Sequence, residues 1–150
     1  MCVLRISGQN LNVEKLILLI DQKPVSIYRK GEPYLKSKPN GRKNKTSGIN
    51  YNVSNASFDD LEKQIKDAIK FIKKYKAQIA EVTFDELVDG STLDFGIDLR
   101  IGYQNVAIQA DSFPSELLKL LGELNIDLGF TLYPPDLENQ IEARADKKDK

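Results

Sequence analysis

Hydrophobic and polar residues alternate along several short runs of the chain, and these runs predict β-strands. The alternation is strictest over residues 93–101, where five large apolar residues are separated by polar residues or glycine. Such a pattern is typical of a strand that is buried on one face. Similar runs predict further strands over residues 2–7, 25–30, 49–53, 106–110 and 126–133. Gly102 lies between two of these runs, so residues 93–101 and 106–110 are predicted to form a hairpin.

Other segments carry apolar residues at steps of three and four, which predicts helices. The longest begins after Ser57, the expected N-cap, with Asp60 at the capping-box position, and its apolar face continues to Ile79. Shorter helical segments are predicted over residues 12–20, 82–87 and 114–124. The lysines of the long helix lie away from its apolar face, so we interpret them as a solvated surface.

This order of elements, βαββα followed by ββαβ, predicts an α+β fold with a mainly antiparallel sheet and helices on one face. The first half, together with the next strand, has the split βαβ order of ferredoxin-like folds. No linker interrupts the pattern, so residues 1–135 are expected to form a single domain. Residues 136–150 are rich in charge and are expected to be a flexible tail.

Charge is balanced over the whole chain, with 22 basic and 22 acidic residues, but it is unevenly distributed. Eight basic residues and one acidic residue lie between Lys23 and Ser47, whereas six acidic residues and no basic one lie between Glu81 and Asp98. A net charge of zero gives no general reason to expect nucleic acid or a membrane as partner. The local bipolarity instead suits a charged protein partner.

The composition excludes several kinds of chemistry. The chain has no histidine and a single cysteine, Cys2, which removes Ser-His and Cys-His catalysis and makes a zinc site very unfavourable. No phosphate-binding glycine motif is present, so we expect no cofactor, no metal and no enzymatic activity. Asp94, Asp98 and Asp127 remain as candidate acids. They are interpreted as solvent-facing residues, although Asp127 could approach one of the others.

The N-terminal residues begin a strand rather than a leader peptide, and the longest apolar run, residues 16–20, is too short to cross a bilayer. A lone cysteine also suits a reducing compartment. We therefore expect a cytoplasmic protein with no membrane partner.

The basic connection between the second and third strands, residues 29–45, is the candidate binding segment. Three interpretations stay open: a solvated mobile loop, a loop that docks on an acidic protein, and a site for single-stranded nucleic acid, in which tyrosines stack on bases and cations hold phosphates. The candidate binding residues are Tyr28, Arg29, Lys30, Tyr34, Arg42 and Lys43. Gly31 is expected to supply a positive φ at the strand end.

The stretches RISG, YRKGEP, LDFGIDLRIG and SFPSELLKLLGELNIDLGFTLYP, spread over residues 2–135, resemble a bacterial family of domains of unknown function. The resemblance implies an α+β fold and a bacterial origin, and it implies no established activity. A position beside toxin systems is a hypothesis for some members of the family. Our hypothesis is a non-enzymatic protein-interaction module with an immunity-like or regulatory role. The alternative is single-stranded nucleic-acid binding through residues 29–45, and the third is an enzyme that uses Asp, Tyr or Lys. The oligomeric state is left open.

Overall fold

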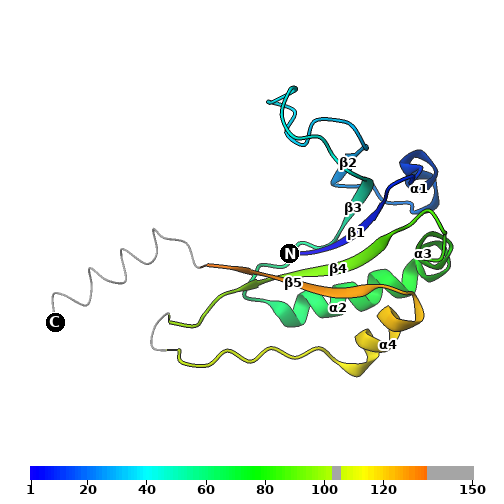
Figure 1. The fold of residues 1–150 in the computed structure, drawn as a ribbon. Coiled ribbons are helices and arrows are strands. Elements are labelled where there is room, and N and C mark those ends of the chain that lie inside the picture. Colours follow the sequence, from blue (N-terminus) through cyan, green and yellow to red (C-terminus); the bar gives the residue numbers. More distant parts are fainter. Residues whose placement is uncertain (103–105, 135–150) are drawn as a thin grey trace.

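The computed structural model describes residues 1–102 and 106–134. Its centre is a five-stranded sheet in the order β2-β3-β1-β4-β5, with helices on one face (Figure 1). The elements are β1 (Cys2–Gly8), α1 (Val13–Leu19), β2 (Ser26–Tyr28), β3 (Ser47–Ser54), α2 (Leu61–Lys74), α3 (Lys76–Thr83), β4 (Gly90–Asp98), α4 (Ser115–Glu123) and β5 (Asp127–Tyr133). The predicted α+β class is confirmed.

The first four strands have the predicted ferredoxin-like arrangement. β1 lies between β3 and β4 and is antiparallel to both, and β2 pairs antiparallel with β3. The fifth strand departs from this scheme, because β5 follows α4 and pairs parallel with β4. A helical crossover between neighbouring parallel strands is a βαβ unit, so the fold is a ferredoxin-like sheet extended by one strand.

The core lies between the helices and one face of the sheet. Leu4, Tyr51, Leu93 and Phe95 are fully buried on this face, and Asn12 caps α1 through its side-chain oxygen. The alternation predicted for residues 93–101 is confirmed for Phe95 and Ile97, while β4 itself begins and ends about three residues earlier than the pattern suggested. Across the described residues, no helix combines the length and apolarity needed to cross a membrane.

The predicted hairpin of residues 93–101 and 106–110 is wrong, because residues 106–110 form no strand. Both sides of β4 are already paired, with β1 on one side and β5 on the other. The Gly102 N–H does donate to the Val106 carbonyl over 2.9 Å, with Gly102 at φ 78°. From residue 106 onward, side-chain hydrogen bonds join the chain to the end of β4: Gln109 accepts from the Arg100 N–H and donates to the Asp98 carbonyl.

The predicted long helix differs at both ends. Asp60, rather than Ser57, is the N-cap, because its carboxylate accepts from the Lys63 N–H over 3.0 Å. The helix also breaks at Tyr75, with φ −108° and ψ 19°. The Tyr75 hydroxyl donates to the Asp21 carbonyl, which ties the break to the segment after α1. The helical piece predicted over residues 82–87 is largely wrong, since α3 ends at Thr83. The predicted tail, residues 136–150, lies outside the described residues.

Candidate functional site

Residues 29–45, in the connection between β2 and β3, form a narrow ribbon, which we call the basic arm, held by backbone hydrogen bonds with one antiparallel bridge between Pro33 and Lys43. It projects from the β2 edge of the sheet, on the side away from α2 and α4 (Figure 1). Gly31, at φ 84°, begins it as predicted. The N–H of Gly31 donates to the Asn44 carbonyl, the N–H of Asn44 donates to the Glu32 carbonyl, and that of Tyr34 donates to the Arg42 carbonyl, all over 2.8–2.9 Å.

The tip of the basic arm, residues 35–41, is closed by two tight turns. The Lys38 N–H donates to the Leu35 carbonyl and the Gly41 N–H donates to the Lys38 carbonyl, each over 2.9 Å. The Lys43 ammonium donates to the Pro39 carbonyl over 3.0 Å. Sequence reasoning missed this ribbon, because its cross-strand bonds join backbone groups and carry no hydrophobic signal.

Arg29 fixes the base of the arm rather than facing solvent alone. Its guanidinium donates from Nε (3.0 Å) and Nη2 (2.5 Å) to Oε1 of Glu14 in α1, and it lies 3.8 Å from Glu32. This pairing lowers the pKa of the Glu14 carboxyl and raises that of Arg29. The Lys30 N–H donates to the Ser47 hydroxyl at the start of β3. Arg29 therefore positions the arm, and its charge is largely compensated within the molecule.

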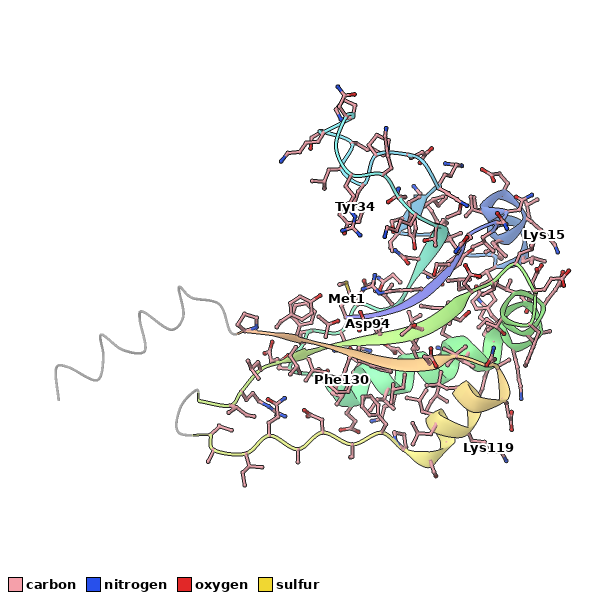
Figure 2. All side chains as sticks on the ribbon, in the orientation of Figure 1. Met1, Lys15, Tyr34, Asp94, Lys119 and Phe130 are labelled. Atoms are coloured by element: carbon pink, nitrogen blue, oxygen red, sulfur yellow. The ribbon has the colours of Figure 1, made fainter. Side chains whose placement is uncertain are left out.

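Two tyrosines lie where the arm meets the sheet. Tyr28 covers Gly48, where an added Cβ would lie only 2.3 Å from the tyrosine ring. Tyr34 is 65% exposed, and the Arg42 guanidinium lies 5.7 Å from the centre of its ring, within cation–π range. Both tyrosines line a shallow cavity of about 260 Å³ with Pro33. Figure 2 shows Tyr34 on the side of the arm that faces the sheet. Tyr28, Tyr34 and Arg42 are thus brought together as candidate binding residues.

The remaining cations of the arm form no ion pair with the described residues. From residue 33 to residue 45 the chain has no acidic residue. Within the part of the chain that the structure describes, ion pairs hold basic residues of β1, α1, α2, α3 and the segment after β4. None of those pairs involves the five basic residues beyond Gly31, namely Lys36, Lys38, Arg42, Lys43 and Lys45.

The six acidic residues between Glu81 and Asp98 differ from the arm, because several of their carboxylates form ion pairs or hydrogen bonds within the molecule. Asp94 lies on the open face of the sheet, the face away from the helices, where it accepts from Arg5 over 2.8 Å and from the Thr131 hydroxyl over 3.0 Å. Asp85 pairs with Lys15, and Asp89 accepts the Gln9 N–H over 2.6 Å.

Of the three candidate acids, Asp94 and Asp127 lie on neighbouring strands, two positions apart in the register. In the parallel register Asp127 lies beside Thr92, and Asp94 lies beside Gly129. No three His, Cys, Asp or Glu side chains among the described residues gather closely enough to hold a metal ion. Cys2 is buried, and burial raises the pKa of its thiol. The basic arm is therefore the surface with the clearest unmatched charge.

Comparison with known proteins identifies the family. The family model described as "Domain of unknown function (DUF4279)" matches residues 1–135, so the chain belongs to this family. This confirms the resemblance to a family of domains of unknown function. No curated protein and no solved structure matches the sequence.

Proposed function

We propose that this chain is a non-enzymatic binding module of the bacterial cytoplasm, whose basic arm docks on an acidic surface of a protein partner in an immunity-like or regulatory role. One observation carries the proposal: five cations that form no ion pair with any described residue lie together on a backbone-bonded ribbon. A concentration of one charge on a projecting segment accelerates encounter with a partner of opposite charge.

The side chains around these cations favour a protein partner over nucleic acid. Tyr34 and Leu35 are 65% and 50% exposed, so apolar area accompanies the charge, a mixture found in protein interfaces. Base stacking needs a free aromatic face. Arg42 lies 5.7 Å from the ring centre of Tyr34 and Tyr28 lies on Gly48, so one face of each ring already has an intramolecular neighbour.

The state of the acids and the thiol supports a non-enzymatic role. General acid–base catalysis needs a carboxyl or another group poised to exchange a proton with a substrate. Asp94 instead accepts from Arg5 and Thr131, and Cys2 is buried with a raised pKa, which disfavours the nucleophilic thiolate.

Paired charge reversals test the proposal. The test variant carries Lys36→Glu and Lys38→Glu in the arm, and the control carries Lys70→Glu and Lys119→Glu, two exposed lysines of α2 and α4. Both variants change the net charge equally. A partner is first identified by capture from the native host and then purified. We expect the arm variant to bind it with an association rate roughly tenfold lower at low salt, and the control with a rate close to that of the unchanged protein.

The same proteins are titrated against a fluorescent single-stranded oligonucleotide. Salt-sensitive binding that only the arm variant loses would favour the nucleic-acid alternative. Equal binding of the purified partner by the arm variant and the control would overturn the docking role of the arm.

A further inference from the structure

Among the described residues, no strand pairs with the outer edge of β5. Phe130 and Leu132 are 61% and 46% exposed although their side chains lie on the helix-covered face, as Figure 2 shows for Phe130. They line a groove of about 240 Å³ that also includes Ile97 and Phe113. Edge strands of natural proteins usually carry a lysine, a proline or a bulge that prevents pairing with another strand. β5, with the sequence DLGFTLY, has no lysine and no proline, and its pairing with β4 is continuous.

The backbone of β5 has a defined outward side. The Leu99 N–H donates to the Tyr133 carbonyl over 2.7 Å, so the backbone groups of Tyr133 face β4. Because these groups alternate along a strand, those of Leu128, Phe130 and Leu132 face away from the sheet. Within residues 1–102 and 106–134, no additional backbone bond reaches these three residues.

The side-chain pattern of β5 reads the same in both directions around Phe130. Leu128 and Leu132 flank it at equal spacing on the helix-covered face. In an antiparallel pair of two copies centred on Phe130, each Phe130 lies opposite its equivalent and each Leu128 lies opposite the Leu132 of the other copy. The outward backbone groups of the same three residues also meet in this register, which allows about six hydrogen bonds. Asp127 lies opposite Tyr133, so no like charges face each other.

We propose that the β5 edge is a self-association site, at which two copies of this chain join through antiparallel β5 strands. Side-chain symmetry and backbone direction select the same register independently. A two-fold contact of this kind is self-complementary and closed. The joined sheet runs continuously through both copies, and each basic arm, at the opposite β2 edge, remains free. The interface is short, so we expect a dissociation constant on the order of micromolar.

Sedimentation velocity of the full chain from about 5 to about 500 µM tests the proposal. The unchanged protein should shift from monomer to dimer over this range. Phe130→Lys and Phe130→Glu should each remain monomeric, because like charges would face each other across the two-fold axis. An equimolar mixture of the two variants should restore a dimer, and native mass spectrometry should show that it contains one chain of each.

The matched control is Ile108→Lys, the same kind of change at an apolar side chain that is 83% exposed and lies outside β5. It should leave the dimer unchanged. Thermal melts verify that each variant is folded. Where a Phe130 variant is not, Leu132→Lys and Leu128→Glu, which lie opposite each other in this register, replace the Phe130 pair. A monomer at every concentration would overturn the proposal, as would a dimer that persists in Phe130→Lys or a mixture that fails to restore it. Failure here leaves the partner test of the basic arm unaffected.

Discussion

A buried amide joins the main helix to the central sheet, and its removal should destabilise the fold. Gln64 of α2 is fully buried, and its Nε2 donates to the carbonyl of Ser57 and to that of Gly96, both over 2.8 Å. These bonds tie the turn before α2 to the end of β4. The perturbation is Gln64→Leu, which keeps a similar volume and removes both bonds.

The magnitude follows from the groups that are left without partners. A buried polar group without a partner costs about 1–3 kcal/mol. The Ser57 carbonyl also accepts from the Asp60 N–H, so the main loss is at Gly96. Against this, the Gln64 Oε1 is itself buried without a partner, and its removal relieves one such cost. Leucine adds apolar burial as well. We therefore expect Gln64→Leu to lower the free energy of unfolding by about 1–2 kcal/mol.

Gln64→Glu sharpens the test. A buried carboxylate facing two carbonyl oxygens is strongly unfavourable, whereas the protonated acid can donate to one of them. Burial raises the folded-state pKa of the new carboxyl above its unfolded value of about 4.3. The folded state then binds the proton more tightly. The free energy of unfolding of Gln64→Glu should therefore fall as pH rises from the unfolded pKa to the folded pKa, and it should recover on acidification. Gln64→Leu should show no such added pH dependence.

Urea melts of both variants between about pH 4.5 and pH 8 provide the measurement. Gln78→Leu, a partly exposed position on α3, is the control and should change stability by less than about 0.5 kcal/mol. A Gln64→Leu protein as stable as the original, together with a pH-independent Gln64→Glu, would refute the view that this amide clamps helix to sheet.

Three further predictions concern the core and the arm. Ile97→Ala should lower the free energy of unfolding by about 2–5 kcal/mol in a denaturant melt, because Ile97 is 4% exposed; a loss near zero would mean that this face is not the core. Burial raises the pKa of Tyr51 to about 12, so stability should fall between about pH 10 and pH 12 by up to about 1 kcal/mol per pH unit, and Tyr51→Phe should remove that slope; an unchanged slope would assign it to other groups. In amide exchange, the N–H groups of Tyr34 and Asn44 should exchange more slowly than those of the tip; strong protection across residues 35–45 would contradict a docking arm.

Periodicity predicted the parts of the fold in which local pattern and tertiary burial agree. Residues 93–101 alternate because one face of β4 is buried, and Phe95 and Ile97 are accordingly buried. The same pattern at residues 106–110 was misleading. Alternation records which side of a segment is apolar, but it does not record whether a neighbouring strand is free to pair with it. β5, about twenty residues further on, occupies that side of β4.

The candidate site was predictable in composition and less so in geometry. The cluster of basic residues identified the segment, and Gly31 identified the turn that begins it. The role of Arg29 depends on Glu14, which lies 15 residues earlier on α1, and no local pattern connects the two. Gln64 was missed for a related reason. A polar residue next to the apolar face of a helix appears solvated in sequence, whereas here two backbone carbonyls make its burial favourable.

The two edges of the sheet suit different kinds of contact. The β2 edge is short, with three residues, and continues into an arm whose lysines repel a second copy of the same arm. Such an edge disfavours self-association and favours an acidic partner. The β5 edge has a symmetric apolar row and no cation within the strand. Neither charge repulsion nor side-chain mismatch therefore disfavours pairing with a second copy in the register centred on Phe130. If both proposals hold, a dimer would present two basic arms at opposite ends of one sheet, and binding to a partner with two acidic sites would exceed the strength of a single arm. The Phe130→Lys variant should then lose this added strength while keeping the association rate of each arm.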